Sequence, residues 1–163
     1  MNIKIKKNGY LIFGNMKIKC ALGKAGTKLL KKEGDKSTPK GKFSVGKLYF
    51  RKDRIQKVKT SLKTKIIKKN MGWCDDPNSK HYNKEVKFES IKTSERLFRS
   101  DQKYDLLLVI NYNANPIIKG KGSAIFLHLT KNFKHTQGCI AIKQKYFLKI
   151  INTINKKTKI FIN

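Results

Sequence analysis

Short segments in which apolar and polar residues alternate, separated by turn dipeptides, constrain the fold of this chain most strongly. Asn8-Gly9 and Gly14-Asn15 are dipeptides typical of tight hairpin turns. Around them, apolar side chains recur at alternate positions, which is typical of strands with one buried face. These positions are Ile3, Ile5, Tyr10, Ile12, Ile18 and Cys20. The pattern predicts an opening antiparallel meander, with Cys20 packed in the core.

Later segments also predict strands. They share the apolar character of core strands and cover residues 42–50, 105–112, 123–129 and 158–162. The run from Leu106 to Ile110 is long enough for a strand that is buried on both faces.

Helices are expected in only two places. Apolar residues at helical spacing predict a helix over residues 143–156, and a second helix is expected over 89–99. Residues 24–41 and 70–88 are rich in Gly, Asp, Asn, Ser and Pro and are expected to be loops. No linker or repeat divides the 163 residues. The expected architecture is a single mostly β domain, residues 1–163, with one or two packed helices.

The net charge of +29 at pH 7 would ordinarily indicate binding to nucleic acid, an anionic membrane or an acidic polymer. However, only four of the 39 basic residues are arginine, and the lysines are spread over the whole chain among many Asn and Ile. Nucleic-acid-binding proteins usually gather arginine on one face, because guanidinium grips phosphates and base edges in ways that ammonium cannot. We therefore interpret the charge mainly as a solvated surface that attracts carboxylate-bearing peptides at low salt. Nucleic acid is not an expected partner and remains a third interpretation.

Cysteine usage and the first residues bear on the compartment. Cys20, Cys74 and Cys139 form no CxxC pair or Cys/His cluster, so neither a disulfide framework nor a zinc site is expected. Residues 1–7 alternate Ile with Lys or Asn, and no apolar run long enough for a signal peptide or a membrane span follows them. The sequence predicts a reduced, cytoplasmic monomer with no membrane span. The periplasm or cell envelope is the alternative.

One segment combines residue types that can carry nucleophilic catalysis. His128 lies near the end of an apolar segment, and Cys139 follows eleven positions later, directly after Gly138. A neighbouring imidazole can take the proton of a thiol and stabilise the thiolate that attacks a carbonyl. Gly138 can adopt a positive φ that turns backbone N–H groups toward a ligand, as in an oxyanion hole. Residue types alone leave open that the cysteine and the histidine are structural.

Three motifs follow one another along the chain. The first is Glu33-Gly-Asp-Lys-Ser-Thr-Pro-Lys-Gly-Lys-Phe43, and the second combines Gly72-Trp-Cys-Asp-Asp-Pro77 with Tyr82-Asn-Lys84. The third runs from Gly120 to His128 and continues in Thr136-Gln-Gly-Cys139. In this order they resemble the YkuD-type L,D-transpeptidase catalytic domain, whose signature is a histidine, a loop and a Ser/Thr-x-Gly-Cys segment. The resemblance covers most of the chain.

The resemblance implies a β-sandwich-like mixed sheet and a reaction without a cofactor or metal. Cys139 would attack the L-centre carbonyl of the bond between diaminopimelate and D-Ala in a peptidoglycan stem peptide or muropeptide. It would form a thioester and expel D-Ala, with His128 as base. An amine acceptor makes such an enzyme an L,D-transpeptidase and water makes it an L,D-carboxypeptidase, which the missing signal peptide favours. The alternative is a catalytically inactive module that binds peptidoglycan or another polyanion. A low-pKa Cys139 that is alkylated well before Cys20 would favour the enzyme.

Other candidate site residues surround this pair. Those expected to bind substrate are Thr136, Gln137, Trp73, Asp76, Tyr82 and Asn83. The last four come from a region that is interpreted either as a lid gripping the stem peptide or as a structured loop with an Asx turn and an aromatic anchor.

Two positions depart from the pattern. Gln137 and Ala141 stand where many family members have His and Arg, so the contacts of that Arg are not transferred to this chain. His135 is expected to be a solvated loop residue, and Cys74 is expected to be inert.

Overall fold

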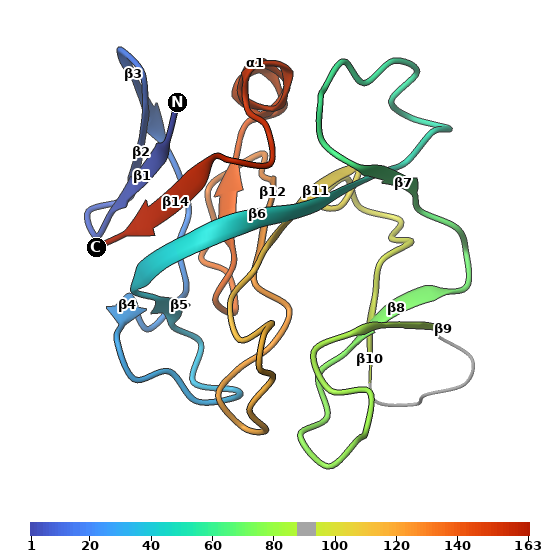
Figure 1. Ribbon diagram of the computed structural model, residues 1–163. Coiled ribbons are helices and arrows are strands. Elements are labelled where there is room, and N and C mark those ends of the chain that lie inside the picture. The colour runs from blue at the N-terminus through green and yellow to red at the C-terminus, as the bar shows by residue number, and fades with distance from the viewer. Residues whose placement is uncertain (88–93) are drawn as a thin grey trace.

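Strand pairing builds most of the structure. A computed structural model describes residues 1–87 and 94–163 of the chain (Figure 1). The strands are β1 (Ile3–Lys6), β2 (Tyr10–Phe13), β3 (Met16–Lys19), β4 (Thr27–Lys28), β5 (Thr38–Pro39), β6 (Gly41–Phe50), β7 (Thr64–Ile66), β8 (Met71–Cys74), β9 (Glu85–Lys87), β10 (Ser94–Arg96), β11 (Leu106–Ile110), β12 (Phe126–Leu129), β13 (Ile140–Ile142) and β14 (Lys159–Ile162). The helix is α1 (Gln144–Thr153). The mostly β fold predicted from the sequence is confirmed.

A nine-stranded mixed sheet forms the centre of the molecule. Its order is β13-β12-β11-β6-β14-β1-β2-β3, with β7 paired to β6. β1 runs parallel to β14, and β12 runs parallel to β13, while β11 is antiparallel to both of its neighbours. A three-stranded sheet, β10-β8-β9, and the two-stranded β4-β5 lie outside it. β12 and β13, which carry the candidate site, therefore lie at one edge of the large sheet.

The core has two parts, one on each face of β11. Leu106, Leu108 and Ile110 belong to the larger hydrophobic cluster, whereas Leu107 and Val109 belong to the smaller one. This explains the unbroken apolar run of β11, because a strand buried on both faces has no position for a polar side chain. Phe147, Ile150 and Ile151 of α1 cover the larger cluster, and Trp73 of β8 packs in the smaller one.

Several predicted elements are confirmed with shifted ends. The opening meander forms β1, β2 and β3 in antiparallel register, and Cys20 is buried in the larger cluster. The helix expected over 143–156 is α1, which stops earlier because Ile154 has extended φ and ψ. The strand expected over 123–129 begins only at Phe126, because Ala124 has a φ of 51°, outside the strand region.

The helix expected over 89–99 is wrong for the residues that the structure describes. Ser94–Arg96 is a strand, β10, which pairs with β8 through Ser94↔Cys74 and Arg96↔Gly72. Residues 88–93 lie outside the described residues. The loop expected over 70–88 is also wrong in part, since it contains β8 and β9. Strand pairing overrides the local preference in both places, between β8 and β10 in the first and between β8 and β9 in the second.

Candidate active site

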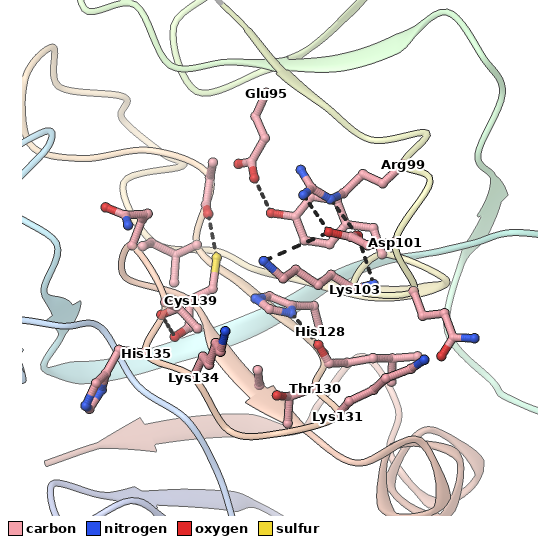
Figure 2. A pocket seen from close by; sticks show the side chains of 18 of the residues that line it. Glu95, Arg99, Asp101, Lys103, His128, Thr130, Lys131, Lys134, His135 and Cys139 are labelled. Atoms are coloured by element: carbon pink, nitrogen blue, oxygen red, sulfur yellow. Dashed lines mark hydrogen bonds and ion pairs between the residues drawn. The ribbon is translucent and has the colours of Figure 1, made fainter.

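A cavity of about 840 Å³ opens at the edge of the large sheet (Figure 2). Distant segments line it, including residues 99–104, residues 128–132 and the loop before β13. Cys139 and His128 both line the cavity, as do Thr136 and Gln137. The two residues predicted to carry the chemistry thus open onto the same space.

Strand register places Cys139 and His128 on one face of the sheet. β12 and β13 are parallel, with Leu127 opposite Ile140 and His128 opposite Ala141. Because side chains alternate between faces, the thiol of Cys139 points to the same side as the imidazole of His128. In Figure 2 the ring of His128 lies beside the side chain of Cys139. The parallel pairing of β12 with β13 therefore brings together two residues that are eleven positions apart in the sequence.

Backbone groups hold the thiol in place. Cys139 Sγ donates to the carbonyl oxygen of Ala124 at 3.1 Å, and the N–H of Phe126 donates to Sγ at 3.4 Å. The carbonyl of Ala124 belongs to a residue with φ of 51°, a left-handed conformation that costs free energy in a non-glycine residue. The chain adopts this conformation at the residue whose carbonyl accepts the hydrogen bond from the thiol.

A single hydrogen bond sets the tautomer of His128. Its Nδ1 lies 2.9 Å from the carbonyl oxygen of Leu129. A carbonyl only accepts, so Nδ1 carries the proton and Nε2 of the neutral ring has a free lone pair. The ring of Tyr104 packs against His128 in a T-shaped arrangement, with ring centroids 5.3 Å apart. The imidazole is thus oriented with its basic nitrogen available to the cavity.

Burial is the main influence on the pKa values of the Cys139 thiol and the His128 imidazole. Burial, followed by the Glu95 carboxylate, raises the pKa of the Cys139 thiol, and burial lowers the pKa of His128 to about 4. Both shifts favour the neutral thiol and the neutral imidazole over the thiolate and imidazolium. A low pKa of Cys139, which would favour the enzyme over the inactive module, is therefore not found in the resting site. Attack by the thiol then requires that the base takes the proton as the new bond forms.

Thr136 shapes the turn that precedes Cys139. Its hydroxyl donates to the Cys139 carbonyl oxygen at 2.6 Å and accepts from the Gly138 N–H at 3.1 Å. Gly138 has a φ of 140°, as predicted, and a Cβ at this position would lie 2.8 Å from the carbonyl oxygen of Ser37. The Gly138 N–H is bound to Thr136, and the contribution of this turn to an oxyanion hole stays a prediction. Gln137 is exposed at the edge of the cavity.

Trp73 and Asn83 of the second motif support the site through hydrogen bonds and packing, whereas Asp75 of the same motif lines the cavity. Asn83 Oδ1 accepts from the Trp73 indole N–H and from the Ala124 N–H, both at 3.0 Å. Trp73 also packs edge-to-face on Phe126, with centroids 5.2 Å apart. These contacts fix the segment around Ala124, whose carbonyl accepts a hydrogen bond from the thiol. Neither Trp73 nor Asn83 is among the residues that line the cavity.

Tyr82 and Asp76 form hydrogen bonds to other loop residues. The Tyr82 hydroxyl donates to Glu33 and accepts from the Gly122 N–H, which ties the first motif to the third. Asp76 Oδ1 accepts from the Asn78 N–H in the expected Asx turn. The structure therefore brings Tyr82 and Asp76 into loop contacts, and a role of either in gripping substrate stays a prediction.

Sequence reasoning missed several residues that line the cavity. Tyr104 donates a hydrogen bond to Glu95, and Arg99 pairs with Asp101 at 2.7 Å. No local pattern marks these residues, because they reach the site through the β10–β8 pairing and the loop before β11. His135 lines the cavity but is exposed, as expected for a loop residue. Cys74 is buried outside it.

Charged side chains around the cavity are balanced in number. Four are basic and four are acidic: Arg99, Lys103, Lys131, Lys134, Glu33, Asp75, Glu95 and Asp101. This balance contrasts with the strongly basic composition of the whole chain. Within residues 1–87 and 94–163, no helix is long and apolar enough to cross a membrane.

The fold and the site together define a mostly β domain in which a histidine of β12 and a cysteine directly before β13 line one cavity. The family model of the L,D-transpeptidase catalytic domain, YkuD, matches residues 4–162. The chain therefore belongs to the YkuD family, whose members are cysteine-dependent L,D-transpeptidases that act on peptidoglycan.

Comparisons with individual proteins add little. No curated protein matches the chain. A similar solved structure is the helical cell shape determining protein Pgp2 from Campylobacter jejuni, with 18% identity and a TM-score of 0.47. The match covers 99% of this chain and 46% of that one, so this chain spans less than half of the other's length.

Proposed function

We propose that this protein transfers the acyl group of a peptidoglycan stem peptide at the L,D bond between diaminopimelate and D-Ala. Cys139 is the nucleophile and His128 the base. The observation that carries the proposal is the β12–β13 register, which turns the thiol and the imidazole toward one cavity. Membership of the YkuD family supports the class of reaction.

The first half of the reaction follows from the protonation states of the two side chains. Nε2 of the neutral His128 accepts the proton of the Cys139 thiol as Sγ bonds to the carbonyl carbon of the L centre. The imidazolium then returns this proton to the nitrogen of the leaving D-Ala as the C–N bond breaks. A thioester on Cys139 and free D-Ala result, and His128 is neutral again.

The second half depends on the acceptor. The acceptor, water or an amine, attacks the thioester carbonyl while His128 removes a proton from it. His128 then passes this proton to the departing Sγ of Cys139. Water yields a tripeptide, whereas an amine yields a cross-linked or exchanged peptide. Both outcomes use the same first transition state.

The charges around the cavity favour a peptide over a polyanion. A stem peptide that contains diaminopimelate carries ammonium and carboxylate groups together, and the cavity offers four charged side chains of each sign. A site for a polyanion would have an excess of basic side chains. This observation weighs against the alternative of an inactive module that binds a polyanion.

We further propose a cytoplasmic carboxypeptidase that trims soluble muropeptides, with the cell envelope as the alternative location. Cys20, Cys74 and Cys139 are all free thiols, which fits a reducing compartment. Soluble fragments in such a compartment meet water far more often than a second stem peptide.

Product analysis distinguishes the two acceptors. We expect purified protein incubated with disaccharide tetrapeptide to release mainly disaccharide tripeptide and D-Ala, resolved by liquid chromatography and mass spectrometry. A parallel incubation with a D-amino acid in excess supplies the competing amine. Mainly cross-linked dimer, or mainly exchange product in the second incubation, would contradict the carboxypeptidase proposal and leave acyl transfer intact.

A further inference from the structure

A buried lysine lies against the turn that carries the nucleophile. The side chain of Lys31 is 3% exposed, and Lys31 is the lysine that the structure buries among the residues it describes. Burying an ammonium group is costly unless it is paired and hydrogen-bonded. The burial of Lys31 therefore requires specific partners for its ammonium group.

Two glycines of the site leave room for this side chain. A Cβ at Gly122 would lie 2.8 Å from Lys31 Cε, and a Cβ at Gly138 would lie 3.7 Å from Lys31 Nζ. Gly122 precedes the segment whose Ala124 carbonyl accepts the hydrogen bond from the thiol, and Gly138 precedes Cys139 itself. The lysine thus lies between the two segments that flank the thiol.

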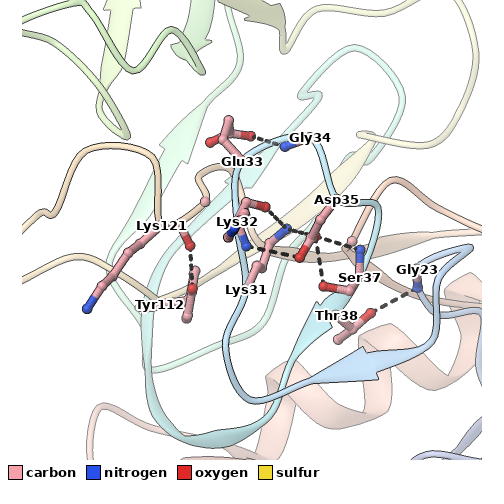
Figure 3. A network of polar contacts seen from close by, with 12 residues as sticks. Gly23, Lys31, Lys32, Glu33, Gly34, Asp35, Ser37, Thr38, Tyr112 and Lys121 are labelled. Carbon is pink, nitrogen blue, oxygen red and sulfur yellow. Dashed lines mark hydrogen bonds and ion pairs between the residues drawn. The ribbon is translucent and has the colours of Figure 1, made fainter.

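Asp35 holds the ammonium in position (Figure 3). Lys31 Nζ donates to Asp35 Oδ1 at 2.7 Å and to the Lys32 carbonyl oxygen at 3.2 Å. Asp35 Oδ1 also accepts from the N–H and the hydroxyl of Ser37. Although burial raises the pKa of Asp35, these hydrogen bonds hold it below its usual range, so the Asp35 carboxyl is ionised near neutrality.

Four titratable groups face the thiol from different elements. They are Glu95 of β10, Tyr104 before β11, His128 of β12 and Lys31. Burial and Glu95 raise the pKa of the Cys139 thiol, while the Lys31 ammonium lowers it. The strand that follows Cys139 is Ile140-Ala-Ile142 and carries no charge. Lys31 therefore acts on the thiol in the opposite sense to Glu95.

We infer that Lys31 is a positioning residue of the nucleophile, whose buried ammonium, fixed by Asp35, stabilises the negative charge that develops on Cys139 Sγ. The inference deepens the proposed function, in which Cys139 attacks, but it concerns thiol reactivity and is measured without substrate. The positive charge of Lys31 offsets part of the free-energy cost of burying a thiolate. The ion pair with Asp35 weakens this effect, because the carboxylate partly neutralises the positive charge.

Two substitutions should shift the reactivity of Cys139 in opposite directions. Lys31→Met removes the cation, keeps the length of the side chain and leaves the Asp35 carboxylate in place. Asp35→Asn keeps the lysine and removes the neutralising charge. At a fixed pH near neutrality, we expect iodoacetamide to alkylate Cys139 about tenfold more slowly in Lys31→Met and about tenfold faster in Asp35→Asn, which corresponds to shifts of roughly one unit in pKa.

The measurement is the pH profile of alkylation on the full chain, read at Cys139 by peptide mass spectrometry. Lys32→Met is the matched control, because it removes the same charge from the neighbouring exposed residue. Thermal unfolding identifies a variant that does not fold. If Lys31→Met fails to fold, faster alkylation in Asp35→Asn alone supports the inference.

Slower alkylation in both variants would overturn the inference, because it indicates a structural brace whose loss disturbs the turn. Unchanged profiles in both, or a shift in Lys32→Met as large as in Lys31→Met, would overturn it as well. Opposite shifts in a protein that releases no D-Ala would contradict the proposed function and leave the role of Lys31 standing.

Discussion

Replacing Cys139 by alanine is expected to lower the release of D-Ala from a tetrapeptide stem by roughly 10⁴-fold or more, into the background of the assay. No other side chain in the described part of the cavity can form the thioester, since Cys20 and Cys74 are buried outside it. The substitution removes one sulfur atom from a buried side chain, so the free energy of unfolding should fall by about 1 kcal/mol.

Cys20→Ala is the matched control, because it makes the same chemical change in the other hydrophobic cluster. It should retain turnover while losing a comparable amount of stability. Release of D-Ala by folded Cys139→Ala at a substantial fraction of the original rate would end the assignment of the nucleophile.

Replacing His128 by alanine is expected to lower turnover by roughly 10²- to 10⁴-fold and to slow the alkylation of Cys139 at neutral pH. The thiol is predominantly protonated, because burial raises its pKa, so a base must remove the proton during attack. The pKa of His128, lowered to about 4, keeps the ring neutral and basic at any higher pH. Turnover should therefore fall as the pH drops through about 4, where the imidazole becomes protonated.

A second variant separates lost chemistry from lost packing. His128→Asn places an amide N–H near the position of Nδ1, so it can still donate to the Leu129 carbonyl and fills more of the space than alanine, yet it cannot act as a base. His135→Ala tests the other histidine at the cavity, which is exposed. If His135→Ala changed the pH profile and both His128 variants did not, the base would be His135.

Local sequence patterns predicted the parts of the fold that depend on local pairing or on a continuous apolar face. The meander formed because its turns and its alternating residues agree, and α1 formed because its apolar residues share one face. The segment around Ser94 was predicted as a helix because its pairing with Cys74 in β8 cannot be seen in the local sequence. Such pairing depends on residues far apart in the chain.

Some residues of the candidate site could be predicted from a local motif, and others could be found only from the fold. His128 and Cys139 were found because a motif holds both of them, and their common face follows from one parallel strand pair. Lys31 was not found, because it is one of many lysines and only the fold shows that it is buried. The raised pKa of Cys139 was also missed, because desolvation depends on the packed surroundings rather than on the neighbouring residues.

The central claim is that Cys139 carries the acyl group, and trapping that intermediate tests it most directly. The protein is mixed with disaccharide tetrapeptide, quenched in acid and digested, and the mass of each cysteine-containing peptide is measured. We expect an adduct equal to the substrate without its D-Ala on the peptide that contains Cys139, and no adduct in Cys139→Ala. Release of D-Ala with the acyl group found on Cys20, Cys74 or a residue other than cysteine would contradict the account.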